Sequence, residues 1–173
     1  MLNNRGQVFT TDLIVAAVVF LFIITFTTIY SNEISYRVTL MEGAEAREIA
    51  ALNVLDSLTL SQGRPANWEL FSDLNRVSSI GLVSSIGDID EQKFEHMIDM
   101  NALHYEAIRY ILGAGAYEMN ISILDMQNRQ VLGEFGTRPL NTDKVTSVSR
   151  PVLYGGEDSL LRVELFEEAA EDE

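Results

Sequence analysis

The hydrophobic pattern near the start of the chain is that of a membrane-spanning helix. Residues 13–32 contain no charged side chain and are apolar on every side of a helix. At about 1.5 Å per residue, these 20 residues would span about 30 Å, the thickness of the hydrocarbon core of a bilayer. We therefore predict a transmembrane helix here.

Two other interpretations of this segment remain open. A helix buried in a soluble core could be equally apolar, although such helices rarely run this long without a polar side. A cleaved secretory signal would have a shorter apolar region followed by a small-x-small cleavage site. The residues Tyr30–Ile34 lack that pattern, so we expect the segment to stay in the mature protein.

A helical period continues beyond the apolar segment. Between Glu33 and Leu60 there is no proline, and apolar residues recur every three or four positions on either side of a gap between Met41 and Ile49. These residues are Ile34, Val38, Met41, Ile49, Leu52, Leu55 and Leu58 or Leu60. Gly43 is a candidate for a bend, and Gly63 followed by Pro65 ends the pattern. The second half of this helix is therefore predicted to be amphipathic and to need a packing partner.

Short helices follow a loop-like stretch over residues 61–90, which Trp68 and Phe71 are expected to anchor to the long helix. Asp88 and Glu91 have the spacing of a capping box, which predicts a helix over about 90–99. Asn101 is a candidate cap for the next helix, which should end before Gly113.

The last third of the chain changes to the period of β-strands. Alternating patterns over residues 117–125, 130–135, 145–154 and 159–166 predict a four-stranded antiparallel sheet with one face packed on the helices. The predicted fold class is α+β: a long N-terminal helix, short helices and this sheet on its outer half.

Charge sets the expected orientation and excludes some partners. The chain has 26 Asp and Glu against 12 Lys and Arg, a net charge of -14, so nucleic acid is not an expected partner. Arg5 precedes the apolar segment, whereas the residues after it are strongly acidic. Positive flanks stay in the cytoplasm. We expect a single-pass membrane protein with its N-terminus inside and its acidic domain outside.

The residues just before the apolar segment carry the most specific pattern. They read Arg5, Gly6, Gln7, four uncharged residues and then Asp12. This arrangement resembles the class III signal peptides of archaeal type IV pilin-like proteins. The resemblance implies that a prepilin peptidase cuts between Gly6 and Gln7, after which the helix remains and assembles with neighbouring subunits. The segment from Gly63 through Pro65 to Trp68 is similar to the same family.

The resemblance also implies a role for Asp12. In pilin-like filaments an acid near the start of the helix meets the free amine of an adjacent subunit, which here would be the amine of Gln7. The chain departs from the family pattern, because the acid is the sixth mature residue instead of the fifth and is Asp instead of Glu. That offset turns the carboxylate by about 100° around the helix. An alternative for Asp12 is a cap at the membrane surface.

These observations divide the chain into four parts: a leader (1–6), a transmembrane and assembly helix (7–32), an extracellular α+β domain (33–166) and an acidic, disordered tail (167–173). Asn120 begins an Asn-x-Ser sequon and is predicted to be exposed, so it is a candidate for N-glycosylation. The chain has no Cys and only two His, and no catalytic, cofactor or metal motif is recognised. His96 and His104, near Glu95 and Asp99, are more simply a solvated helix surface than a metal site.

Three functions are consistent with this pattern. The first is a type IV pilin-like or pseudopilin subunit of a surface filament or secretion apparatus, whose outer domain sets adhesion or the choice of partner. The second is a membrane-anchored extracellular binding or structural domain that never polymerises. The third is a membrane-tethered enzyme, for which no site can be named. The first is our expectation, with the bilayer, related subunits and a prepilin peptidase as partners and no enzymatic activity.

Overall fold

The computed structural model describes residues 4–71, 73–85, 87–140, 142 and 144–167, without the side chains of 4–12, 35–37, 39–40 and 42. Most of the predicted acidic tail, residues 168–173, lies outside this described part. The chain divides into two compact units, Met1–Gly43 and Ala44–Glu173, and each is described by itself. The helix α1, Asn4–Leu60, contributes its first part to the first unit and its last part to the second.

The first unit consists of the apolar part of α1. Leu13–Ile34 is the one helical segment in the described part of the chain that is long and apolar enough to cross a membrane. None of its side chains is buried within the chain. The hydroxyls of Thr25 and Thr28 donate to the carbonyls of Leu21 and Ile24, four residues earlier, so these polar groups are satisfied within the helix.

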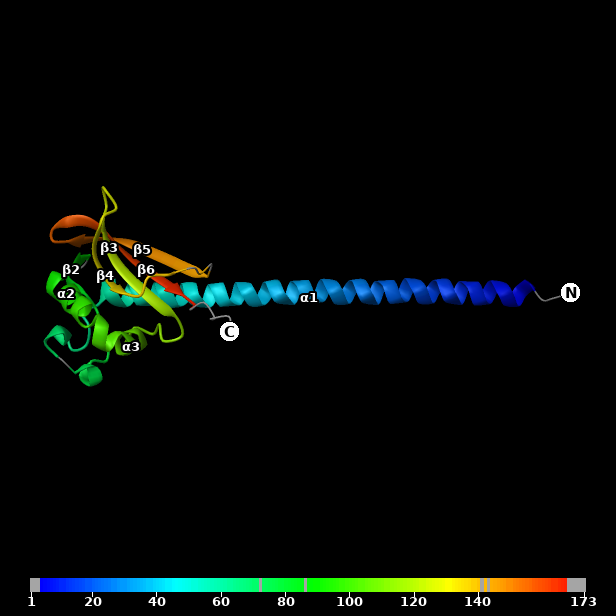
Figure 1. Ribbon diagram of the computed structural model, residues 1–173, viewed down its shortest axis with the longest axis horizontal. Helices are drawn as coiled ribbons and strands as arrows, with labels where there is room; N and C mark the ends of the chain where they lie inside the picture. Colours follow the sequence, from blue (N-terminus) through cyan, green and yellow to red (C-terminus); the bar gives the residue numbers. More distant parts are fainter. Residues whose placement is uncertain (1–3, 72, 86, 141, 143, 168–173) are drawn as a thin grey trace. The chain divides into compact units, whose positions relative to one another are not determined.

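The second unit combines helices with one sheet (Figure 1). After α1 come two short 3-10 helices, Trp68–Leu70 and Leu74–Arg76. The other helices are α2 (Glu91–Asp99) and α3 (Asn101–Ile111). The strands are β1 (Val83–Ser85), β2 (Asp88–Ile89), β3 (Glu118–Asp125), β4 (Val131–Gly136), β5 (Val145–Tyr154) and β6 (Glu157–Phe166). The α+β class is confirmed.

The sheet is mixed and has six strands in the order β1-β2-β5-β6-β3-β4, so the prediction of four antiparallel strands was wrong. The four predicted strands are present and antiparallel, and β5 and β6 form a hairpin around Gly155 and Gly156, both with positive φ. The two additional strands are three and two residues long, and β2 pairs with β5 in parallel. Strands this short have no readable alternation and form because β5 offers them an edge.

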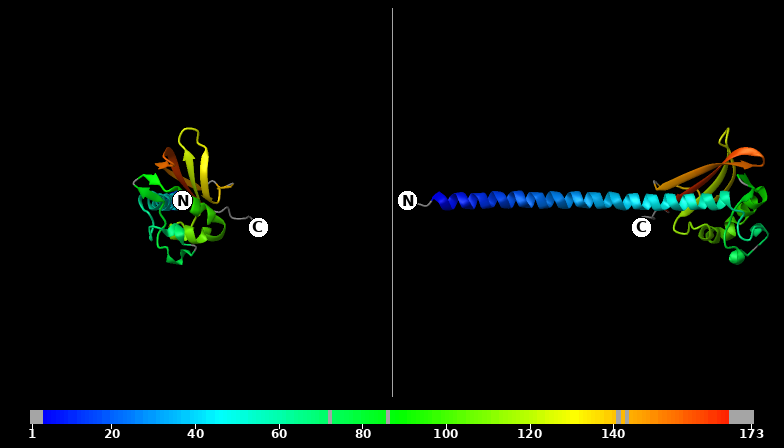
Figure 2. Two further views of the ribbon diagram at one scale, coloured as in Figure 1. Left: turned by 90° about the vertical axis from the view of Figure 1, so that its left-hand side faces the viewer. Right: turned by 180° about the vertical axis from the view of Figure 1, so that it is seen from behind.

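The last turns of α1 lie between the sheet and a layer made by α2, α3 and the preceding loops (Figures 1 and 2). From α1, the side chains of Ala51, Val54, Leu55 and Leu58 are buried in the core. The sheet contributes the alternate residues Met119, Ile121 and Ile123 of β3, Phe135 of β4, and Leu161, Val163 and Leu165 of β6. The period-2 pattern of these strands therefore gives one packed face, as predicted.

The predicted packing side of α1 was only partly correct. Leu55 and Leu58 are buried, but Ile49, Leu52 and Leu60 are exposed. The buried face runs instead through Arg47, Ala51, Val54, Leu55 and Leu58. An amphipathic pattern shows that a helix has apolar positions, but the tertiary partner decides which of them it covers.

The helix caps also differ from their predictions. Asp90 caps α2, because its Oδ1 accepts from the N–H groups of Gln92 and Lys93, whereas Asp88 lies in β2. Asn101 is the first residue of α3 and does not cap it. Its carboxamide instead bonds the N–H and the C=O of Gly136, at the end of the edge strand β4. Those two groups of the strand edge are therefore satisfied within the chain.

In the loop between α1 and α2, Trp68 is buried in the same core as Leu55 and Leu58 of α1, whereas Phe71, the other predicted anchor, is only half-buried. The Trp68 side chain is fully buried and its Nε1–H donates to the carbonyl of Gly81, at 2.8 Å. The buried ammonium of Lys93 donates to the carbonyls of Gln62 and Ala66, at 2.8 and 2.7 Å. The backbone of this loop is thus held by hydrogen bonds from two side chains, one in the loop and one in α2.

Candidate functional site

The apolar surface of α1 is the most prominent candidate site in the first unit. The apolar side chains of Leu13–Ile34, such as Phe20 and Phe22, are exposed. Exposing so large an apolar surface to water is unfavourable, and a bilayer or another apolar helix would cover it. Gly6, Gln7 and Asp12 belong to α1 by their backbone, but their side chains lie outside the described part of the structure. The cleavage and pairing roles of these residues stay predictions.

A second apolar surface lies on the part of α1 that belongs to the second unit. We call Ile49, Leu52 and Leu60 the outer stripe; their side chains are 52%, 41% and 68% exposed. Their spacing places them within about 80° of one another around the helix. The core residues Val54, Leu55 and Leu58 lie on the other side of the same turns. One side of this helix is therefore covered by its own domain, whereas the opposite side carries the exposed outer stripe, with Asp56, which pairs with Arg150, between Leu52 and Leu60.

Two arginines fix which side of the helix faces the domain. Arg47 of α1 donates to the hydroxyl of Thr146 in β5 and to the carboxylate of Glu167, at 3.0 and 2.9 Å. Arg150 of β5 donates to Asp56 and Thr59 of α1. One arginine donates from the helix to the strand and the other donates from the strand to the helix. Rotating the helix to bury the outer stripe would break these hydrogen bonds.

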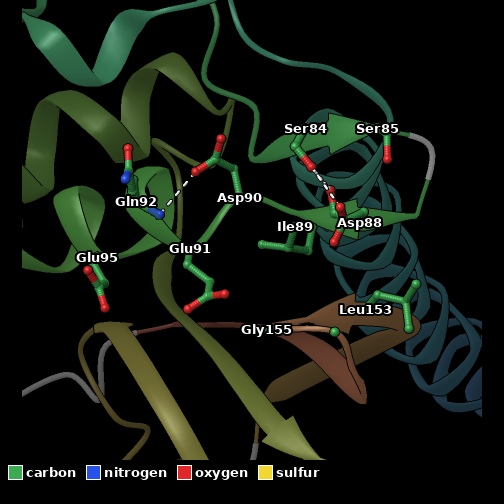
Figure 3. A pocket seen from close by; sticks show the side chains of 11 residues that line it. Ser84, Ser85, Asp88, Ile89, Asp90, Glu91, Gln92, Glu95, Leu153 and Gly155 are labelled. Atoms are coloured by element: carbon green, nitrogen blue, oxygen red, sulfur yellow. Dashed lines mark hydrogen bonds between the residues drawn. The ribbon is translucent and has the colours of Figure 1, made fainter.

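An acidic groove opens beside the start of α2 (Figure 3). It has a volume of ≈ 880 Å³, and its carboxylates come from Asp88, Asp90, Glu91 and Glu95. Asp88 accepts from the hydroxyl of Ser84, at 2.9 Å, and Asp90 caps α2.

The carboxylates of the acidic groove affect a neighbouring tyrosine and do not form a metal-ligand group in the described part of the chain. Burial raises the pKa of Tyr154, and the charges of Glu95 and Glu91 add to the shift. No group of three potential ligands that could hold a metal ion occurs among the residues that the structure describes.

A second groove, with a volume of ≈ 510 Å³, carries the opposite charge. We call it the arginine groove; it is lined by Arg64, Pro65, Phe71, Arg76 and Ser78. No sequence pattern singled out these residues as a site. A signal was present, because Arg64 and Arg76 are the only basic residues in the loop region 61–90, but a residue count does not show that they share a groove.

Comparisons with known proteins give no family for the chain. It matches no protein-family model and no curated protein. Its function must therefore be argued from its own residues.

Asn120 is buried, so the expectation that it is exposed was wrong. It is 1% exposed, and its Nδ2 donates to the Glu134 carboxylate at 2.8 Å. Arg138 also donates to this carboxylate and, as the main cause, holds the pKa of Glu134 below its usual value. β3 lies between β4 and β6, and Glu134 of β4 and Arg162 of β6 bond to its side chains Asn120 and Ser122. A glycan on Asn120 would have to displace these contacts.

The two histidines are separated, as predicted, because they lie on different helices. His96 of α2 has its ring centroid 6.1 Å from that of Trp68, and its buried Nε2 has no hydrogen-bond partner among the residues that the structure describes. His104 lies on α3 and is half-buried. The solvated helix surface predicted for this region therefore does not describe His96, which packs against the indole.

Proposed function

We propose that the chain is a type IV pilin-like or pseudopilin subunit that assembles through α1 into a surface filament or a secretion apparatus. A prepilin peptidase removes residues 1–6, and Gln7 becomes the new N-terminus. The apolar segment holds the subunit in the cell membrane before assembly. The acidic domain then lies outside the cell and decorates the assembly.

The outer stripe is the observation that carries this proposal. A plain membrane anchor accounts for the exposed apolar residues of Leu13–Ile34, because lipid covers them. It does not account for Ile49, Leu52 and Leu60, which belong to the domain-bearing unit and remain exposed there. Packing of α1 against α1 of neighbouring subunits would cover both surfaces. A non-polymerising anchor would leave the outer stripe in water.

The first experiment is to map the N-terminus of the protein isolated from its own cell membranes, by intact mass and terminal peptides. We expect a start at Gln7, with the amine free or cyclised. Gly6→Val, which places a branched side chain at the cleavage position, should leave the uncut precursor in the membrane. A wild-type protein that starts at Met1 or Leu2 would contradict the proposal and favour the plain anchor.

A further inference from the structure

The pairing of the arginines distinguishes two of them from most of the others. Among the arginines whose side chains the structure describes, five pair with carboxylates: Arg47, Arg109, Arg138, Arg150 and Arg162. Arg64, Arg76 and Arg129 form no ion pair among the described residues. In a chain with 26 acids and 12 bases, an unpaired arginine is the exception. Two of these three lie in the arginine groove.

The backbone around this groove is well tied. Arg64 N–H donates to the carbonyl of Ser79, and the N–H and the hydroxyl of Ser78 both donate to the carbonyl of Arg64. Arg76 has its guanidinium carbon 5.9 Å from the centre of the Phe71 ring, a cation–π contact that restrains the side chain. The guanidinium groups therefore extend from a fixed frame, and their planar forks suit carboxylates.

We propose that the arginine groove binds the acidic segment 168–173 of a second copy of this chain. The segment reads Glu-Ala-Ala-Glu-Asp-Glu, with four carboxylates in six residues. It follows Glu167, which is already paired with Arg47 and Lys144 of its own copy. Charge complementarity thus links the most acidic part of one copy to a groove that two unpaired arginines line.

Distance argues against occupation by the same copy. Glu167 contacts Arg47, whereas the groove begins beyond Leu60, the last residue of α1. The intervening 13 residues of helix span about 20 Å. Six fully extended residues reach about 20 Å at most. A segment pulled straight along the helix could barely arrive at the groove and could not turn into it, so a neighbouring copy is the better donor.

The inference concerns the second unit and does not depend on filament assembly. The donor copy must be displaced along α1 relative to the receiving copy, because a copy at the same height in a bilayer would have to bridge the same distance of about 20 Å. Both arginines are exposed, so salt screens the contact and each contributes modestly.

The test uses the full chain in detergent micelles at low concentration. The probe is a fluorescein-labelled peptide with the sequence of residues 166–173, amidated at its C-terminus, and binding is followed by fluorescence anisotropy. Arg64→Gln and Arg76→Gln should each weaken binding about threefold, and the double variant about tenfold. Arg129→Gln is the matched control, because it removes an unpaired arginine outside the groove and should leave the affinity unchanged.

Two results would overturn the proposal. One is an equal loss of affinity in Arg129→Gln, which would show only a response to net charge. The other is peptide binding that persists when every Glu and Asp of the probe is replaced by Gln and Asn. Thermal melts of each variant verify that the domain stays folded, which is expected because both groove arginines are at the surface.

Discussion

At the scale of single residues, the domain depends on polar side chains that form hydrogen bonds with its backbone. Lys93 is buried, and its ammonium donates to two carbonyls of the loop that follows α1. Tyr105 plays a similar part between α3 and β3: its hydroxyl donates to Glu118 and accepts from the N–H of Met119. These groups hold connections in place that apolar packing alone would leave free.

Lys93→Met should destabilise the second unit by about 2 kcal/mol, because the carbonyls of Gln62 and Ala66 lose their charged donor. The measurement is denaturant unfolding in micelles, followed by the fluorescence of Trp68, which is the chain's single tryptophan. Lys144→Met is the matched control: Lys144 pairs with Glu167 at the surface, so its loss should cost less than about 0.5 kcal/mol. Equal losses in the two variants would rule out the anchoring role of Lys93.

Tyr105 should make the domain sensitive to alkaline pH. Burial raises its pKa to about 12, with the Glu118 carboxylate adding to the effect. Because the folded pKa lies above the unfolded value of about 10, its stabilising contribution is complete below pH 10 and disappears as pH rises toward 12. The side chain is partly buried and solvent still screens it, so we expect a loss of only about 1–2 kcal/mol.

The check is the urea midpoint measured from pH 9 to pH 12. Tyr105→Phe should remove this component of the pH dependence, whereas Tyr110→Phe, at an exposed position of α3, should preserve it. An unchanged pH profile in Tyr105→Phe would assign the alkaline loss to other groups.

At the scale of elements, the helices and hairpins follow local patterns, but their close approaches depend on small residues. Gly81 lies where the end of α1 meets the loop, and a Cβ there would come within 2.2 Å of the Ser61 carbonyl oxygen and 2.6 Å of the Gly63 nitrogen. Gly43 lies within α1, and a Cβ there meets no atom within 4 Å apart from the helix itself. The two glycines therefore have opposite physical roles.

Gly81→Ala should destabilise the domain by about 3 kcal/mol or more, because backbone atoms must move to accept the methyl group. Gly43→Ala is the contrasting variant and should stabilise the helix by about 0.5–1 kcal/mol, since alanine loses less conformational entropy there. Denaturant midpoints test the first and helical circular dichroism on heating tests the second. A tolerated alanine at Gly81 would show that the loop can shift to make room.

At the scale of the whole molecule, an apolar anchor and a bare outer stripe occur on one helix. If α1 packs on its neighbours, the stripe becomes a subunit interface; if it does not, those residues remain an exposed apolar surface. The proposal predicts that substitutions in the outer stripe reduce assembly without changing the stability of the domain.

Leu52→Gln should reduce filament or pseudopilus formation about tenfold, because covering an aliphatic side chain contributes about 1.5 kcal/mol or more per interface. Glutamine keeps the helix, so folding and membrane insertion should be unchanged. Leu103→Gln, at an exposed leucine of α3, is the control and should assemble normally. Asp12→Ala should likewise lower assembly and leave insertion intact. Normal assembly of the Leu52 variant would remove the stripe from the interface.

Much of the fold can be predicted from consecutive residues, for a physical reason that differs between elements. An uncharged segment of membrane length is recognisable because every residue in it must be apolar, whatever its neighbours are. The β5–β6 hairpin is recognisable because Gly155 and Gly156 permit positive φ between two alternating runs. The helix α2 is also local, although its cap proved to be Asp90 and not Asp88.

The features that failed prediction are those that depend on contacts between distant segments. The strand β2 pairs with the end of β5, 65 residues later in the chain, and β1 pairs with β2, so no local period predicts them. Asn120 is on the outward face of its strand, as alternation indicates, but Glu134 and the neighbouring strands bury it. Alternation gives the face of a residue; its exposure depends on what other strands place over it.

By itself, therefore, the sequence determined the apolar helix, the α+β class and the pattern that resembles a pilin leader, because each of these is written in consecutive residues. The tertiary structure alone decided which side of α1 the domain covers and that Arg64 and Arg76 share one groove. Both depend on where the chain returns in space. The stabilising energy of such contacts is gained only once the whole domain has closed around α1.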